Sequence, residues 1–258
     1  MASTPLAASN ARLKELRKLS RRSERSERRL FLADGPKAVE GALSVPDCVV
    51  EVLATPAASE QYAALLSAAP GVTLVDDRAM AGLSDSVTPA GLVAVCRFLE
   101  PVVPASPRLV AICADVRDPG NAGTVIRCAD AAGADLVVLA GDSVDLYNPK
   151  TIRASVGSVF HLPVVVERDP VAAVAAAKDA GLTVLAADMD GEDLFAADEL
   201  LRTPTAWLFG NEAWGIPAEL SAAADHVVSI PIYGRAESLN LSTAAAVCLY
   251  ASARAQRG

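Results

Sequence analysis

The chain has 258 residues and a formal charge of −8, and 52% of its residues are apolar whereas only 4% are aromatic. This length suffices for one large domain or two smaller ones with a buried core, and the composition favours an α/β protein over an aromatic-rich β-sandwich. Taken alone, the acidic charge argues against a nucleic-acid partner.

The first predicted element, a helix over residues 11–29, reverses that charge balance. It carries nine Lys or Arg residues against three Glu. Such asymmetry is typical of a segment that meets a polyanion. The alternative is a solvated helix in which acidic and basic side chains pair four positions apart. The nine basic residues are Arg12, Lys14, Arg17, Lys18, Arg21, Arg22, Arg25, Arg28 and Arg29.

The next segment, residues 31–99, predicts a compact α/β domain. FLADGPKAVEGAL indicates a strand and a helix, VVEVLAT a strand, PAASEQYAALLSAA a helix, and GVTLVDD and GLVAVCRF two more strands. The three prolines of EPVVPASP, at 100–107, then predict a linker.

Residues 108–258 predict a second α/β domain with a parallel sheet. Strands are expected at LVAICADV, LVVLAG, LPVVV, LTVLAAD, AWLFG and HVVSIPI, and helices from Asn121, around TIRASVGSVF, at 170–180 and at about 239–255. Nearly all-apolar strands indicate a sheet covered on both faces. A ligand should then lie at the carboxyl ends of its strands, near the loops DPGNAG, GNEAWGIP and IPIYGRAESLN.

Several chemistries are disfavoured by what these loops contain. The chain has no Gly-x-Gly-x-x-Gly and no lysine that follows a glycine, so neither a dinucleotide fingerprint nor a phosphate-loop lysine is present. His161 and His226 adjoin strand-like runs and read as structural, and two histidines are too few for a His-based metal site or a hydrolytic triad. No metal is therefore expected.

The five cysteines are odd in number and without Cys-x-x-Cys spacing, which indicates reduced core residues in a cytoplasmic protein. The N-terminus lacks the apolar region of a signal peptide, and the longest uncharged stretch, 238–253, is too short and too polar to span a membrane. We expect a soluble cytosolic protein.

The loop at residues 118–123 has a purely structural interpretation. Asn121 is a good N-cap, Pro119 and Gly120 suit a turn, and Arg127 can pair with Asp130 along the helix. That interpretation is weakened because polar residues recur at the other two strand-to-helix turns, in GNE and in SLN.

Three stretches in this order resemble motifs one, two and three of the SpoU/TrmH branch of the SPOUT methyltransferases: DVRDPGNAGTVIRCADAAGADLVVL, LFGNEAWGIP and IPIYGRAESLNLSTAAAVCLYASAR. TIRASVGSVFHLPV between them is also similar. Upstream, FLADGPKAVEGAL and SVTPAGLVAV resemble the ribosomal-protein-like (L30e-like) substrate-binding domain of the rRNA-modifying and thiostrepton-resistance members. The resemblance implies a C-terminal domain with a deep trefoil knot.

The resemblance also implies an S-adenosylmethionine-dependent RNA 2′-O-ribose methyltransferase that acts on 23S rRNA, with tRNA as the alternative substrate and a non-catalytic RNA-binding module as a further one. It implies a homodimer, and RNA phosphates as the partners of the basic segment. The implied catalytic residues are Asn121, Arg127, Glu212, Ser238 and Asn240. The implied cofactor-binding residues are Leu208, Gly210, Ile216, Ile230 and Leu239.

The matching arginine is assigned by the family to activation of the ribose hydroxyl. A guanidinium stays protonated at ordinary pH and makes a poor general base. We therefore expect Arg127 to hold the neighbouring phosphate and to stabilise the developing alkoxide.

Overall fold

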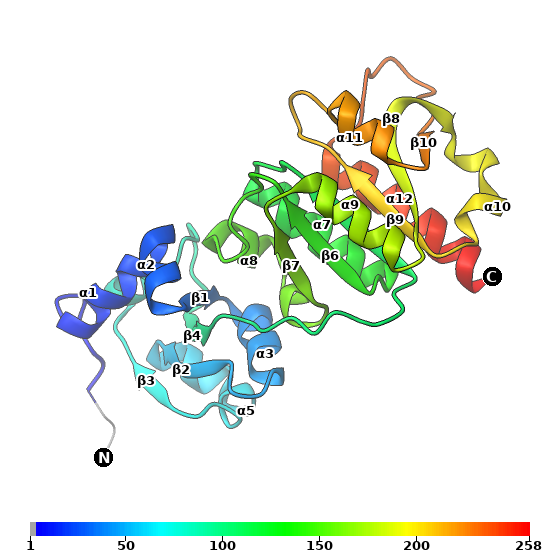
Figure 1. Ribbon diagram of the computed structural model, residues 1–258. Helices are drawn as coiled ribbons and strands as arrows, with labels where there is room; N and C mark the ends of the chain where they lie inside the picture. Colours follow the sequence, from blue (N-terminus) through cyan, green and yellow to red (C-terminus); the bar gives the residue numbers. More distant parts are fainter. Residues whose placement is uncertain (1–3) are drawn as a thin grey trace. The chain divides into compact units, whose positions relative to one another are not determined.

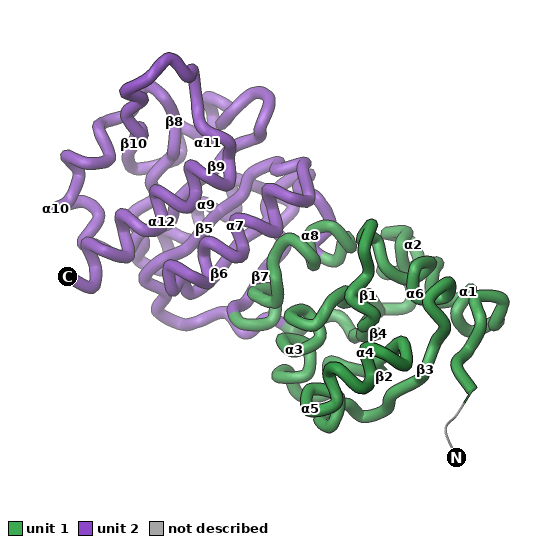
Figure 2. The backbone as a smooth tube through the Cα atoms, turned by 180° about the vertical axis from the view of Figure 1, so that it is seen from behind, with its two compact units in different colours: residues 1–100, 147–161 green, residues 101–146, 162–258 purple. Residues whose placement is uncertain are grey.

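The computed structural model describes residues 4–258, which form two compact units. Unit 1 contains the chain up to Glu100 together with Tyr147–His161. Unit 2 contains Pro101–Leu146 and Leu162–Gly258 (Figure 2). Each unit has its own sheet and its own core.

Unit 1 is built on a four-stranded sheet of order β1-β4-β2-β3. The inner strand β4 pairs antiparallel with β1 and β2, whereas β2 and β3 are parallel. The strands are β1 (Leu30–Asp34), β2 (Val49–Ala54), β3 (Val72–Leu74) and β4 (Leu92–Arg97). The alternation of segments predicted an α/β unit, which this is, but it did not predict the antiparallel pairing of β4.

Short helices surround this sheet. The α-helices of unit 1 are α1 (Ala11–Arg17), α2 (Arg22–Arg28), α3 (Pro36–Ser44), α4 (Pro56–Gln61), α5 (Ala63–Leu66), α6 (Asp77–Ala81) and α8 (Pro149–Ser155), and its 3-10 helices are η1 (Lys18–Ser20) and η2 (Ser158–Phe160). The basic segment is therefore two helices joined by a 3-10 turn. Its leucines, Leu13, Leu16 and Leu19, are buried in the core of unit 1 with Met80 and Val93, so this segment is part of the folded unit and not an appendage.

One segment of unit 1 comes from the later part of the chain. Tyr147 stacks on Phe98 with ring centroids 3.9 Å apart, and Phe160 stacks on Phe31 at 6.1 Å. The Tyr147 hydroxyl also accepts a hydrogen bond of 2.9 Å from the Leu99 N–H. These aromatic contacts place Tyr147–His161 in unit 1, whereas the sequence boundaries put the segment in the second domain.

Unit 2 is built on a six-stranded sheet of order β10-β8-β9-β5-β6-β7 in which every neighbouring pair is parallel. The strands are β5 (Leu109–Ala114), β6 (Leu136–Ala140), β7 (Val164–Glu167), β8 (Thr183–Asp193), β9 (Thr205–Phe209) and β10 (His226–Ser229) (Figure 1). The predicted parallel sheet is confirmed. The central strands are buried along their whole length, which explains their continuous apolar runs.

Helices cover both faces of this sheet. The helices of unit 2 are α7 (Pro119–Ala132), α9 (Pro170–Asp179), η3 (Leu194–Ala196), α10 (Asp198–Leu201), α11 (Ala218–Ala223) and α12 (Leu241–Arg257). Ala173 of α9 and Leu220 of α11 pack with Leu208 on one face. On the other face, α7 and α12 lie side by side (Figure 2), and the Trp207 indole N–H donates to the Ser252 hydroxyl at 2.9 Å.

Two predicted helix starts differ from the structure. Helix α7 begins at Pro119, because the Asp118 side chain is the N-cap and accepts the Asn121 N–H at 2.8 Å. The prediction of Asn121 as N-cap was therefore wrong, and its side chain is free for other contacts. Helix α12 begins at Leu241, with Asn240 as its N-cap. No helix within residues 4–258 is long and apolar enough to cross a membrane.

Candidate functional site

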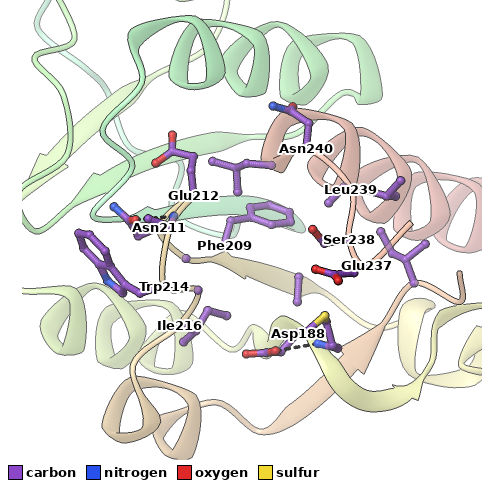
Figure 3. Close-up of a pocket in the computed structure, with 18 of the residues that line it drawn as sticks. Asp188, Phe209, Asn211, Glu212, Trp214, Ile216, Glu237, Ser238, Leu239 and Asn240 are labelled. Carbon is purple, nitrogen blue, oxygen red and sulfur yellow. Dashed lines mark hydrogen bonds between the residues drawn. The ribbon is translucent and has the colours of Figure 1, made fainter. Parts of the chain in front are cut away.

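The three predicted loops meet at the carboxyl ends of the strands of unit 2. The loop after β5 leads into α7, and the loop after β9 leads toward α11 on the opposite face of the sheet. Neighbouring β5 and β9 thus send their connections in opposite directions, which makes the switch point at which open α/β sheets bind ligands. A pocket of about 700 Å³ lies here (Figure 3).

A hydrogen-bond chain joins the three motifs at the edge of this pocket. The Asn121 amide donates to Glu212 Oε1 at 3.1 Å, and the Asn240 amide donates to Asn121 Oδ1 at 3.0 Å. Asn121 comes from motif one, Glu212 from motif two and Asn240 from motif three. An asparagine can serve both contacts because its side chain carries a donor and an acceptor. Residues about 90 and 120 positions apart in sequence are therefore held together by one side chain.

Glu212 also fixes the loop that follows β5. Its two carboxylate oxygens accept the backbone N–H groups of Arg117 and Asp118, each at 3.1 Å. Partial burial by itself would raise the pKa of Glu212, but hydrogen bonds from its own and these two backbone N–H groups and from the Asn121 amide lower the pKa overall. The carboxylate is thus held ionised at neutral pH.

The loop after β9 is a tight hairpin that needs glycine. Asn211 and Gly215 exchange backbone hydrogen bonds of 2.9 Å in both directions. A Cβ atom on Gly210 would lie 2.3 Å from the Gly215 carbonyl, which no real side chain tolerates, and Gly215 has φ +71° with open space where a side chain would be. The Asn211 amide anchors the hairpin by donating to the Asp115 carbonyl at 2.6 Å.

Most sequence-predicted residues of unit 2 line this pocket, and two do not. Leu208 is fully buried in the core against α9 and α11, because it points to the face of β9 away from Phe209. Arg127 lies on an exposed turn of α7, outside the lining. The predicted residues in the lining are Asn121, Gly210, Glu212, Ile216, Ile230, Ser238, Leu239 and Asn240.

Sequence reasoning missed several lining residues, among them two carboxylates and the residue that anchors the hairpin. Asp188 and Met189 come from β8, Trp214 from the hairpin and Glu237 from the loop before α12. The carboxyl end of β8 should have been considered with the other loops, since all strand ends of a parallel sheet meet at one edge. Asn211, the anchor, is a buried polar side chain between two residues that were selected.

The predicted RNA-contacting residues of unit 1 divide into three groups. Arg25 is 2% exposed and donates to the carbonyls of Leu19 and Ser20, so its burial argues against a contact with RNA. The Nε and Nη2 atoms of Arg17 are buried. Four others form ion pairs: Arg12 with Glu51, Lys18 and Arg28 with Glu15, and Arg29 with Glu100.

The third group is Lys14, Arg21 and Arg22. All three are exposed, and none has an ion-pair partner in the part of the chain that the structure describes. The basic segment therefore combines both sequence interpretations, since some of its charges pair internally and three are available to a polyanion.

Two family models match most of the chain. Residues 108–250 match the SpoU rRNA methylase family, and residues 10–94 match the MRM3-like substrate-binding domain. The chain is 35% identical over 245 residues to the 23S rRNA (guanosine(2553)-2′-O)-methyltransferase RlmP of Bacillus subtilis, covering 95% of this chain and 96% of that protein.

Solved structures are similar over almost the whole chain. A crystal structure of an RNA 2′-O ribose methyltransferase has a TM-score of 0.84 at 35% identity and covers 98% of this chain and 99% of that one. The methyltransferase AviRb from Streptomyces viridochromogenes, in complex with AdoMet, has a TM-score of 0.83 at 30% identity, with 95% and 98% covered. The family predicted from the three motifs is confirmed: the chain belongs to the SpoU rRNA methylase family.

Proposed function

We propose that the protein is an S-adenosylmethionine-dependent methyltransferase that modifies a ribose 2′-hydroxyl of 23S rRNA. The observation that carries this proposal is the hydrogen-bond chain from Glu212 through Asn121 to Asn240, which joins all three motifs beside one pocket. Support comes from RlmP, which is similar over both units.

The pocket fits the methyl donor in size and in charge. Its volume of about 700 Å³ lies within the range of small-molecule sites. The charged side chains of its lining are carboxylates, which suit a cation and repel a nucleotide phosphate. Gly210, Ile216, Ile230 and Leu239 would hold the cofactor, the open backbone at Gly215 allowing close approach. When bound, the cofactor supplies an electrophilic methyl group.

The chain's own residues then need only to position the ribose. The Glu212 and Asn121 contacts fix the loop after β5, and Asn240 Oδ1 accepts the Ser242 N–H at 2.9 Å while its amide holds Asn121. The Ser238 hydroxyl lines the pocket beside them. The attacking hydroxyl would approach between Ser238 and Asn121. Leu208 is buried in the core beneath the site, so it would support the site without contacting the cofactor.

Arg127 takes the role of an electrostatic group in this proposal. Its exposed guanidinium is free to pair with a phosphate of bound RNA, and it carries the planar fork that matches phosphate oxygens. It would stabilise the alkoxide that develops as the hydroxyl attacks, and would not remove the proton itself.

We assign substrate recognition to unit 1, with Lys14, Arg21 and Arg22 contacting RNA phosphates. A solved structure that concerns the 2-OH methylation of C/U34 on tRNA covers only 57% of this chain, at a TM-score of 0.51. RlmP covers both units, and this favours rRNA over tRNA. A trefoil knot in unit 2, a homodimer and a cytoplasmic location belong to the same proposal. So do the boundaries 1–30, 31–99, 100–107 and 108–258, except that Tyr147–His161 and the basic segment 11–29 pack within unit 1.

The test is transfer of labelled methyl from S-adenosylmethionine to unmodified 23S rRNA and, separately, to tRNA, followed by alkaline digestion. A methylated 2′-hydroxyl cannot assist strand cleavage, so we expect label in alkali-resistant dinucleotides from rRNA. Label in mononucleotides would mean base methylation and would contradict the proposal. Label from tRNA alone would identify tRNA, and not rRNA, as the substrate. Absence of both label and cofactor binding would indicate a non-catalytic RNA-binding module.

A further inference from the structure

The pocket lining carries an excess of negative charge. Its charged side chains, among the described residues, are Asp188, Glu212 and Glu237. Glu212 is engaged by loop N–H groups and by Asn121. Asp188 and Glu237 form no ion pair with any residue from 4 to 258; Asp188 Oδ1 accepts only the neighbouring Met189 N–H, at 2.7 Å. Carboxylates without a cationic partner in a concave site concentrate negative potential there.

The position of Asp188 is built into the backbone of β8. The pairing of β10 with β8 jumps from Val227 opposite Ala186 to Val228 opposite Glu192. Residues 187–191 are therefore looped out of the ladder, and they carry Asp188 to the pocket. Gly191 closes this bulge, since a Cβ there would lie 2.5 Å from the Val227 backbone. Bulges re-aim side chains and are common beside active sites.

Glu237 reaches the same pocket from a different element. It lies on the loop that leads into α12, next to Ser238, while Asp188 comes from β8 (Figure 3). Glu237 is an exposed residue of the lining. Two carboxylates from separate elements thus flank the space in which the cofactor would bind.

The methyl donor and its product differ in charge. S-adenosylmethionine carries a sulfonium, an ammonium and a carboxylate, and hence one net positive charge at neutral pH. Transfer breaks the sulfur–methyl bond, the sulfur keeps the electron pair, the 2′-oxygen bonds the methyl carbon, and the hydroxyl proton is released to solvent. S-adenosylhomocysteine is therefore a neutral thioether with no net charge.

We propose that Asp188 and Glu237 make the pocket select the charged methyl donor over its neutral product, so that transfer itself weakens retention of the product. This inference rests on the proposed function, since it takes the pocket as the cofactor site. At partly solvated separations of several ångströms, two such charges alter the affinity for a cation by about three- to tenfold. The same charges leave the affinity for the neutral product nearly unchanged.

The test is calorimetric binding of three ligands: S-adenosylmethionine, S-adenosylhomocysteine and sinefungin, an analogue with a protonated amine where the donor has its sulfonium. The double variant Asp188→Asn/Glu237→Gln keeps side-chain size and removes both charges. Asp179→Asn, an exposed acidic residue outside the pocket, is the matched control. We expect the variant to bind the donor and sinefungin three- to tenfold more weakly, to bind the product as before, and the control to match wild type.

Two other outcomes would contradict the inference. Equal weakening of all three ligands would mean that the carboxylates bind a part that donor and product share, and no change in any would mean that they have no role; either overturns the inference. Raising ionic strength with the wild-type protein gives a second measurement, because donor and sinefungin affinity should fall while product affinity stays constant. If the wild-type protein binds none of the three, the proposed function itself fails.

Discussion

The pocket edge of unit 2 and the basic segment of unit 1 were both singled out from sequence, and the structure treats them differently. At the pocket, residues from three distant motifs converge, and Asn121 bonds to both Glu212 and Asn240. In the basic segment, most charged side chains bind partners within their own unit, and Arg25 is buried. A motif defined by residue types at fixed positions specified a site, whereas a run of like charges specified mainly a surface composition.

The largest effect is expected where backbone geometry depends on a single glycine. In Gly210→Ala the added methyl group would meet the Gly215 backbone, so the hairpin after β9 must move. We expect cofactor affinity to fall on the order of 100-fold, equivalent to about 3 kcal/mol. Calorimetry with S-adenosylmethionine measures this.

Gly234→Ala is the matched control for that hairpin. Gly234 lies in the loop before α12, and a Cβ atom there meets nothing within 4 Å. Its cofactor affinity should equal that of the wild type. Unchanged affinity in Gly210→Ala would show that the hairpin does not shape the cofactor site.

The next effect concerns the double role of Asn121. The variant Asn121→Asp replaces the amide that donates to Glu212 with a second carboxylate. The hydrogen bond is lost, and the two carboxylates repel each other. Because a misplacement of about 1 Å in a reacting group can cost about 100-fold in rate, we expect methyl transfer to fall by that order while cofactor affinity changes far less.

The same substitution at Asn148 controls for this variant. Asn148 is the N-cap of α8 in unit 1, where aspartate is an equally good cap. Asn148→Asp should therefore retain transfer. Full transfer by Asn121→Asp would remove the hydrogen-bond chain from the mechanism.

Arg127 sharpens the comparison because it was predicted as catalytic and yet lies outside the pocket lining. Arg127→Lys keeps the charge but loses the planar fork, so we expect RNA binding to be retained and methyl transfer to drop at least about tenfold. Filter binding and single-turnover transfer separate the two readouts.

Arg202→Lys, an exposed arginine paired with Glu199, should behave as wild type in both assays. Wild-type turnover in Arg127→Lys would refute the catalytic assignment.

The basic segment offers a comparison at constant net charge. Replacing Lys14, Arg21 and Arg22 with Gln removes three unpaired cations, whereas replacing Lys18, Arg28 and Arg29 removes three that already pair with carboxylates. Each phosphate contact contributes about 0.7 to 0.9 to the slope of log affinity against log salt. We expect the first triple variant to reduce that slope by about 2 and the second by less than about 1.

Equal slopes in the two triple variants would mean that RNA does not distinguish paired from unpaired charges. Substitution is preferable to deletion of residues 1–30, because Leu13, Leu16 and Leu19 belong to the core of unit 1.

The sequence was sufficient for the strands of unit 2 and for the motif residues, because buried parallel strands read as apolar runs and turn residues are chemically distinctive. It failed for two features that depend on the folded backbone, one a long-range strand pairing and one a local turn. The bulge that brings Asp188 to the pocket depends on the pairing of β8 with β10. The burial of Arg25 depends on carbonyls that only the turn at Leu19 and Ser20 exposes. Neither the bulge nor the burial of Arg25 can be recognised from the pattern of residue types.

The smallest expected effect is the dependence of stability on the ionisation of Glu212. Its folded-state pKa lies below the ordinary value of 4.5 because loop N–H groups and the Asn121 amide stabilise the carboxylate more than burial destabilises it. Between the two pKa values the unfolded chain binds more protons than the folded one, so stability rises with pH in that window. The contribution is complete above pH 4.5 and is lost as the pH falls through the lower folded-state value.

Thermal melts of wild type and Glu212→Gln from pH 7 down to pH 3 measure this contribution. The wild type should lose more of its melting temperature than the variant below pH 4.5, since Gln has no proton to take up, and the two curves should run parallel above it. Many other carboxylates titrate in the same range, but they are common to both proteins and cancel in the difference. A difference that stayed constant down to pH 3 would mean that the contacts from Arg117, Asp118 and Asn121 do not depend on the charge of Glu212.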